Sequence, residues 1–343
     1  MTAAPPPADR PPDRPFVTVV MPVRDEGGFI DRSLGAVLDQ DWPADRMEVL
    51  VADGRSTDGT REAIEAWAGR DPRVTLIDNR EGIVPTGLNR AIARARGSVV
   101  VRIDGHAIVP TDYLTRCLAL LEESGADCAG GIIETVGEGA EGRAIALAQA
   151  SPFGVGNATF RTGTGSPRAV DTLAFGAYRR DVFERIGAFD EELVRNQDDE
   201  LNYRLTQAGG VIWLDPTIVS TYYSRGTVRR AWRQYFQYGF YKVRVIQKRG
   251  GVPAPRQLVP AVMVLGLASA AGLSLVRRDV RWFAAATLPY LAADVAVSVR
   301  TAREDPAALP YLPVAFPTLH LAYGTGFLKG LWRFRSRWGD GGA

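Results

Sequence analysis

The chain has 343 residues, a formal net charge of +2 and 46% hydrophobic residues. This length suits one large domain with an appendage, and the near-neutral charge gives no reason to expect nucleic-acid binding. Cys117 and Cys128 lack CxxC spacing, so we expect reduced, buried thiols, and two histidines are too few for a histidine-built zinc site.

The N-terminal residues 1–15 are rich in proline and lack the apolar core of a secretory signal. We expect a disordered tail, followed by a domain on the cytosolic side. Residues 16–225 then form the predicted α/β domain. Its first half alternates four strands with four helices: strands at Phe16–Pro22, Met47–Ala52, Val74–Ile77 and Val99–Ile103, and helices at Glu26–Leu38, Thr60–Ala68, Pro85–Ala95 and Thr111–Glu123.

This alternation indicates βαβ units and a mostly parallel sheet, whose carboxyl strand ends share one ligand-binding edge. The alternation loosens beyond Ala126. Glu138–Pro167 is rich in glycine and small residues, and we predict a mobile loop region there. Further strands are expected at Cys128–Glu134, Leu173–Arg180 and Val211–Leu214, with a helix at Glu200–Ala208.

The C-terminal part differs in composition. Residues 226–256 contain a basic, aromatic amphipathic helix, Val228–Arg249, which suits a membrane surface or packing on the preceding domain; the two are compatible. Residues 257–335 form the predicted membrane region, with apolar stretches at Leu258–Val276, Trp282–Val299 and Leu309–Leu328. We favour a two-helix membrane hairpin with the proline-broken third stretch interfacial or re-entrant, because arginines and lysines flank it. Three crossings are the alternative.

Acidic residues follow the predicted strands. Asp104 closes a buried strand and precedes Gly105 and His106, and Asp53 directly follows another apolar strand. Carboxylates at this edge of an α/β sheet hold metals and phosphates. Asp58 is equally explained by a turn and helix cap. The turns contain neither GxxxxGK[ST] nor GxGxxG, so neither a P-loop NTPase nor a dinucleotide fold is supported.

Five motifs in this order resemble the family 2 glycosyltransferases. They are PVRDE at 22–26, ADGRSTDGT at 52–60, GLNRAI at 87–92, RIDGH at 102–106 and NQDDELNYRL at 196–205. The resemblance implies a GT-A fold and inversion at the sugar carbon. Segments 233–239 and 320–327 are similar to the membrane-attached members, especially the ExoA-like enzymes that build bacterial exopolysaccharides on a lipid carrier.

The resemblance also implies a donor side. Pro22, Val23 and Glu26 would line the nucleotide pocket, and Asp53 would contact the uracil or ribose. Asp104 would lie beside the diphosphate and a divalent cation, Mn²⁺ or Mg²⁺. His106 stands where the usual DXD motif has its second aspartate, and it is either the second metal ligand or a structural bystander.

On the acceptor side, the resemblance implies that Asp198 is the general base. Gln197 replaces the usual glutamate before it, and Asp199 is a rival base or a helix N-terminal charge. The RW pair of processive relatives is absent, which favours adding one sugar per encounter. The remaining acceptor-side residues implied are Gly176, Ala177, Asp199, Gln234 and Tyr238.

These features predict an inverting, metal-dependent glycosyltransferase on the inner membrane, with two or more crossings and its catalytic domain cytoplasmic. It would move one sugar from a nucleotide sugar, in particular a UDP-sugar, to a lipid-linked saccharide. Two alternatives stay open. One is an enzyme that glycosylates polyprenyl phosphate itself, and the other is a non-catalytic nucleotide-sugar-binding scaffold.

Overall fold

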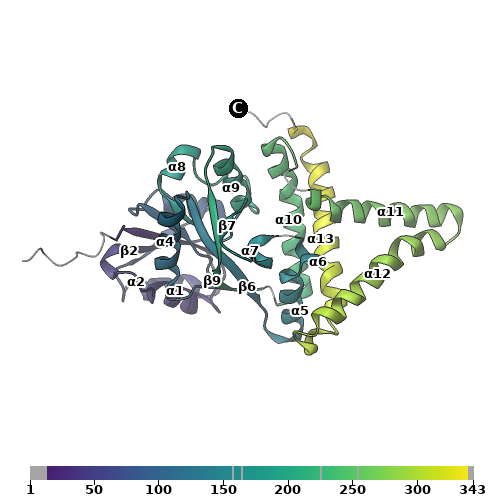
Figure 1. Ribbon diagram of the computed structural model, residues 1–343, viewed down its shortest axis with the longest axis horizontal. Coiled ribbons are helices and arrows are strands. Elements are labelled where there is room, and N and C mark those ends of the chain that lie inside the picture. Colours follow the sequence, from purple (N-terminus) through teal and green to yellow (C-terminus); the bar gives the residue numbers. More distant parts are fainter. Residues whose placement is uncertain (1–13, 157, 164, 225, 253–254, 339–343) are drawn as a thin grey trace, which may run out of the picture.

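The computed structural model describes residues 14–156, 158–163, 165–224, 226–252 and 255–338, so residues 1–13 of the predicted tail lie outside it. Figure 1 shows three parts in a row: a sheet domain, a pair of long helices, and a helical hairpin that projects away from the sheet. The predicted α/β architecture followed by C-terminal apolar helices is confirmed.

Four parallel strands form the first half of the sheet, in the order β3-β2-β1-β4. They are β1 (Val17–Val23), β2 (Met47–Asp53), β3 (Val74–Asp78) and β4 (Val99–Arg102). Alternate residues of β1 enter two cores: Val19 packs with the helices α1 (Ile30–Leu38) and α2 (Thr60–Ala68), and Val20 packs with α3 (Val84–Ile92). Both faces are therefore covered, which explains the uninterrupted apolar runs of these strands.

The second half of the sheet is mixed. The short strand β8 (Ala177–Arg179) lies antiparallel between β4 and β6 (Cys128–Val136), and β6 pairs in parallel with β9 (Ile212–Tyr223). The predicted strand at Val211–Leu214 thus continues to Tyr223. The sheet domain also contains the elements η1 (Ala44–Arg46), β5 (Ala107–Ile108), α4 (Tyr113–Ser124), β7 (Arg168–Ala169), α8 (Asp181–Ile186) and α9 (Gln197–Gln207).

The prediction of a mobile loop at Glu138–Pro167 was wrong for much of that range. It contains α5 (Gly139–Ala150), α6 (Pro152–Val155) and α7 (Thr159–Thr162). Ala144, Ile145 and Ala148 of α5 are buried in a cluster with the C-terminal helix pair. Alanine favours helix and permits close packing, so small residues here mark a contact between helices.

The long helices α10 (Val228–Arg249) and α13 (Leu312–Arg333) lie side by side (Figure 1). Glycines make this contact close. A Cβ on Gly239 would lie 2.0 Å from the Tyr323 carbonyl oxygen, and one on Gly326 would lie 2.0 Å from that of Phe236. The third apolar stretch is therefore one continuous helix: α13 runs through Pro317 and buries one face against α10.

The hairpin consists of α11 (Val259–Arg277) and α12 (Arg281–Thr301). Within the described residues, these two helices are long and apolar enough to cross a membrane. Most of their side chains are exposed, unlike those of a buried core helix. Short 3-10 turns, η2 (Pro255–Gln257), η3 (Pro306–Ala308) and η4 (Arg335–Arg337), adjoin the C-terminal helices.

Candidate active site

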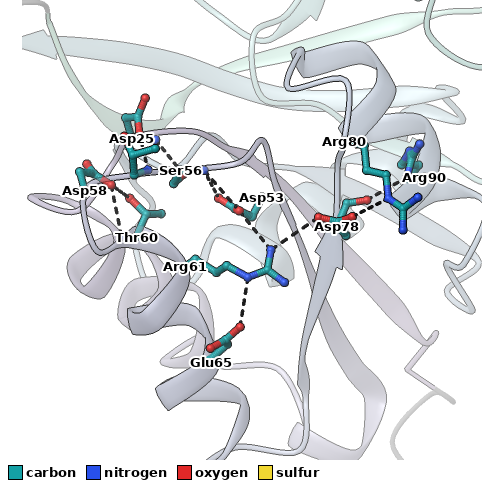
Figure 2. Close-up of polar contacts among 11 residues, drawn as sticks. Asp25, Asp53, Ser56, Asp58, Thr60, Arg61, Glu65, Asp78, Arg80 and Arg90 are labelled. Carbon is teal, nitrogen blue, oxygen red and sulfur yellow. Dashed lines mark hydrogen bonds and ion pairs between the residues drawn. The ribbon is translucent and has the colours of Figure 1, made fainter.

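Acidic side chains lie at the carboxyl edge of the parallel strands. The sheet register aligns Val23 with Asp53 and Asp53 with Asp78. Arg61, from α2, stands between the last two: its Nη1 lies 3.4 Å from Asp53 Oδ2 and 3.6 Å from Asp78 Oδ1 (Figure 2). Arg61 also pairs with Glu65. The Asp53 side chain is 0% exposed, so it is a fixed part of this edge.

Hydrogen bonds lock the loops after β1 and β2 together. Ser56 Oγ accepts from the Asp25 amide at 2.9 Å (Figure 2). Asp25 Oδ1 in turn accepts from the Thr57 amide at 2.9 Å. Asp58 accepts from the Gly27 amide at 2.9 Å and from the Thr60 amide at 3.2 Å. Asp58 is thus a turn residue that accepts from the first helical amide, while Gly59 occupies the N-cap position of α2.

A cavity of about 1320 Å³ opens beside this edge and extends to α10, α11, α12 and α13. Gly176, Ala177 and Asp53 do not line it, although Gly54 does. Gly176 packs where a Cβ would meet Cys128 Sγ at 2.7 Å, and Ala177 is buried in β8. Most of the predicted site residues do line the cavity: Pro22, Val23, Glu26, Asp104, His106, Asp198, Asp199, Gln234 and Tyr238.

Arg102 joins the two most important predicted carboxylates. Its side chain is 6% exposed, its Nη2 lies 2.9 Å from Asp104 Oδ1, and its Nη1 forms an ion pair with Asp198 Oδ1. Burial raises the pKa of the Asp104 carboxyl, but the charge and hydrogen bond of Arg102, together with His106 and Arg195, outweigh burial and hold that pKa below its ordinary value. Residues about a hundred positions apart in the sequence therefore form one charged unit on the cavity wall.

Asp199, the rival base, is occupied differently. Lys242 Nζ lies 2.6 Å from Asp199 Oδ2, and Arg249 Nη2 lies 3.3 Å from the same oxygen. Burial raises the pKa of Asp199, but the two cations of α10 together lower it below its ordinary value. A carboxylate held by two cations is a weak proton acceptor, which counts against Asp199 as the base.

His106 is oriented by Glu26. The His106 Nδ1 atom lies 2.8 Å from Glu26 Oε1, and the imidazole contacts the Tyr222 ring edge-on. An Nδ1–H that donates to the carboxylate leaves the Nε2 lone pair available, and the buried Nε2 has no hydrogen-bond partner among the described residues. A carboxylate that orients a histidine in this way is typical of metal-ligating histidines.

The described residues contain no cluster of three or more acidic, histidine or cysteine side chains able to hold a metal by themselves. Asp104 and His106 nevertheless fit an incomplete oxygen–nitrogen donor set. A divalent cation commonly binds through one or two protein ligands together with substrate phosphate oxygens. The donor diphosphate would complete such a site.

Sequence reasoning missed the basic partners of these acids. Three basic side chains pair with acids that the motifs had identified: Arg102 with Asp104, Arg61 with Asp53, and Lys242 with Asp199. Arg102 had left a signal, because it interrupts the apolar strand Val99-Val100-Val101-Arg102-Ile103 next to Asp104. Arg61 and Lys242 lie on exposed-looking helical positions, and only the tertiary structure brings them to the site.

A nucleotide-binding-type α/β sheet, a carboxylate-lined cavity at its carboxyl edge and the five motifs together define a glycosyltransferase of the GT-A type. The family model "Glycosyl transferase family 2" matches residues 18–187. The succinoglycan biosynthesis protein ExoA of Rhizobium meliloti (strain 1021) is 33% identical over 325 residues, which cover 93% of this chain and 96% of that protein. The chain therefore belongs to glycosyl transferase family 2 and is a glycosyltransferase.

More distant proteins agree. A Methanococcus voltae dolichyl N-acetyl-glucosaminyl phosphate glucuronosyltransferase is 26% identical and covers 68% of this chain and 74% of its own length. The mannosyltransferase PcManGT of Pyrobaculum calidifontis, solved with GDP-Man and Mn²⁺, superposes with a TM-score of 0.59 at 23% identity. That superposition covers 94% of this chain and 88% of PcManGT. The structural likeness shows a shared GT-A fold.

Proposed function

We propose that this protein is an inverting glycosyltransferase that moves one sugar from a nucleotide sugar to a lipid-linked saccharide, in the synthesis of an extracellular polysaccharide or other glycan. The observation that carries the proposal is the cavity itself. It begins at Asp104 and Asp198, which Arg102 links, and ends among the apolar helices α11, α12 and α13. A single cavity thus connects the carboxylates proposed to act on the donor with an apolar surface that a lipid could contact.

The donor occupies the sheet end of the cavity. Pro22, Val23 and Glu26 line the nucleotide pocket, while Asp53, paired with Arg61, lies buried behind it and does not line the cavity. Asp104 and His106 would hold Mn²⁺ or Mg²⁺, which would supply positive charge to stabilise the diphosphate leaving group. The Mn²⁺ and GDP-Man in the PcManGT structure support this assignment.

The transfer is a single displacement. The acceptor hydroxyl oxygen bonds to the anomeric carbon as the bond from that carbon to the diphosphate oxygen breaks, and the nucleoside diphosphate leaves. The hydroxyl proton passes to Asp198, which needs to lie within about 3 Å of the acceptor oxygen. One displacement inverts the anomeric configuration and forms no covalent enzyme intermediate.

The acceptor enters from the apolar end. Gln234 and Tyr238 of α10 line the cavity there, and the Gln234 amide donates to the Tyr238 hydroxyl at 3.0 Å. We assign the hairpin α11–α12 to two crossings of the inner membrane, with the sheet domain cytoplasmic and α10 at the interface. The names of the Rhizobium and Methanococcus relatives, which refer to a polysaccharide and to a dolichyl phosphate saccharide, support a lipid-carried acceptor.

Nucleoside diphosphate release tests the proposal. Detergent-solubilised full-length protein with Mn²⁺ is given a panel of nucleotide sugars, UDP-sugars first, with a lipid-linked saccharide, with polyprenyl phosphate or with neither. We expect release that requires the lipid-linked saccharide and one donor. Release with polyprenyl phosphate that survives Asp198→Asn would instead identify an enzyme that makes a lipid-linked sugar donor, since a phosphate acceptor needs no base. Donor binding without turnover across the panel would indicate a scaffold.

A further inference from the structure

The basic residues of α10 fall into two groups. Those in its second half pair with acids: Lys242 with Asp199, Arg244 with Glu192, and Lys248 with Asp190. Those in its first turns, Arg230 and Arg233, line the cavity and have no acid within ion-pair distance in the described structure. The cavity-lining arginines without an acidic partner thus lie in the first turns of α10.

Two further cations line the cavity from other elements. Arg161, from α7, also lines the cavity; its Nη1 donates to Thr135 Oγ1 at 3.1 Å, and its guanidinium lies 5.5 Å from the Tyr222 ring centroid. Arg256 lines the cavity from η2 and packs against Gly156, where a Cβ would lie 3.1 Å from Arg256 Cδ. Neither guanidinium has an acidic partner among the described residues. Four arginines from three elements therefore line one cavity, and none of them has an acidic partner among the described residues.

The groups that surround these arginines indicate which chemical class of ligand they could bind. Arg256 immediately precedes α11, whose first turn adds Val259, Pro260 and Met263 to the cavity wall. Tyr222 touches both His106, on the donor side, and Arg161. Arg256 thus lies beside the apolar helices, and Arg161 lies beside the donor side. A ligand that fits is a polyanion attached to an apolar chain on one side and to a sugar on the other.

We infer that Arg161, Arg230, Arg233 and Arg256 bind the diphosphate of a lipid diphosphate-linked saccharide acceptor. The inference rests on the proposed function and specifies its acceptor: the lipid lies along the apolar helices, the diphosphate meets the arginines, and the saccharide reaches Asp198. Guanidinium groups suit this role because they bind phosphate oxygens through paired hydrogen bonds and stay charged. The donor diphosphate is bound elsewhere, beside Asp104.

The test compares two acceptors that carry the same saccharide, one on a polyprenyl diphosphate and one on an uncharged alkyl chain. The full-length double variant R230Q/R233Q should raise KM for the diphosphate acceptor by about tenfold or more and leave KM for the nucleotide sugar unchanged. It should transfer to the alkyl glycoside as the wild type does. R229Q is the matched control, because Arg229 is an exposed neighbour on α10 that does not line the cavity.

Equal losses on both acceptors, or no loss on either, would overturn the inference, and a raised donor KM would reassign the arginines to the donor diphosphate. A second measurement does not depend on turnover. In native mass spectrometry, the wild type and R229Q should retain polyprenyl diphosphate in preference to polyprenol, and R230Q/R233Q should not. Equal retention by all three proteins would overturn the inference, even if the wild type transferred sugar to neither acceptor and the proposed function thereby failed.

Discussion

Lys242 Nζ lies 2.6 Å from Asp199 Oδ2, so an ion pair joins α10 to the first turn of α9. The adjacent Asp198 turns instead to Arg102 on β4. Two neighbouring carboxylates of one helix turn therefore have different tasks. Asp199 fastens the helix that forms the cavity wall, and Asp198 stays at the wall beside the donor side.

Replacing these two residues separately should distinguish the tasks. Asp198→Asn removes the proton acceptor and should lower kcat by about 10²–10⁴-fold, while its melting temperature should fall less than that of Asp199→Asn because Arg102 keeps Asp104 as a partner. Asp199→Asn leaves two cations without their partner and should lower the melting temperature by roughly 4 °C or more. Its kcat should fall less. Nucleoside diphosphate release and thermal unfolding in detergent provide the measurements. Full activity in Asp198→Asn would rule out the base assignment.

Comparing enzyme activity with Mn²⁺ and with Mg²⁺ should show whether His106 ligates the metal. If Nε2 ligates the cation, His106→Asp exchanges a nitrogen ligand for an oxygen ligand and should shift activity from Mn²⁺ toward Mg²⁺. We expect at least a severalfold change in the ratio of the two activities. Glu26→Gln, which weakens the orienting contact at Nδ1, should raise the Mn²⁺ concentration needed for half-maximal activity about 10-fold or more. Unchanged metal preference in His106→Asp would show that His106 is a bystander.

Acid should loosen the junction around Glu192. Burial raises the pKa of Glu192, but hydrogen bonds and charge from Arg244 and Lys248 outweigh it and lower the pKa from the ordinary 4.5 to about 2. The ionised pairs therefore stabilise the fold fully above about pH 4.5, and the contribution fades as pH falls toward 2.

Glu192→Gln should consequently melt below the wild type at pH 7, and the difference should shrink as pH falls below 4.5. Thermal unfolding between pH 3 and pH 7 measures this. Glu123→Gln, at an exposed position on α4, is the control and should show no such pH dependence. A gap between Glu192→Gln and the wild type that stays constant across this range would contradict the assignment.

Gly326 should tolerate no side chain. An added Cβ would lie 2.0 Å from the Phe236 carbonyl oxygen, so α10 and α13 would have to separate. Gly326→Ala should lower the melting temperature by roughly 2–10 °C and reduce transfer to the lipid acceptor. Gly272→Ala in α11 is the matched control, because nothing lies within 4 Å of the position that an added Cβ would take there, and it should be neutral or slightly stabilising. Equal melting temperatures would contradict the close-contact interpretation.

The strands β1 to β4 and their helices could be predicted because each carries a local signal: buried strands read as apolar runs, and helices read as amphipathic repeats. The carboxylates at their ends followed from the parallel topology. β8 could not be placed, since three residues carry little pattern and its insertion between β4 and β6 depends on distant strands. α5 was missed because its alanines and glycines give no clear polar face.

The site residues likewise fall into those that local motifs identify and those that only the folded structure brings together. Asp104 and Asp198 were found from local motifs, whereas their link through Arg102 exists only in the folded chain. Gly176 and Ala177 were expected at the acceptor and instead pack inside the sheet, where a single position on the chain gives no sign of which face it will meet. Pairing between distant elements is set by the tertiary structure and leaves little trace in a single sequence.

The close crossing of α10 and α13 has a consequence for how the protein is made. Leu319, His320 and Tyr323 of α13 complete the cavity, yet they follow the hairpin α11–α12 in the chain. During synthesis, the sheet domain and α10 leave the ribosome first, the hairpin next and this last wall only afterwards. The cavity is therefore completed only after the hairpin has emerged. A nascent chain already contains the sheet edge proposed to bind the donor before it contains the last wall of the cavity proposed to receive the acceptor.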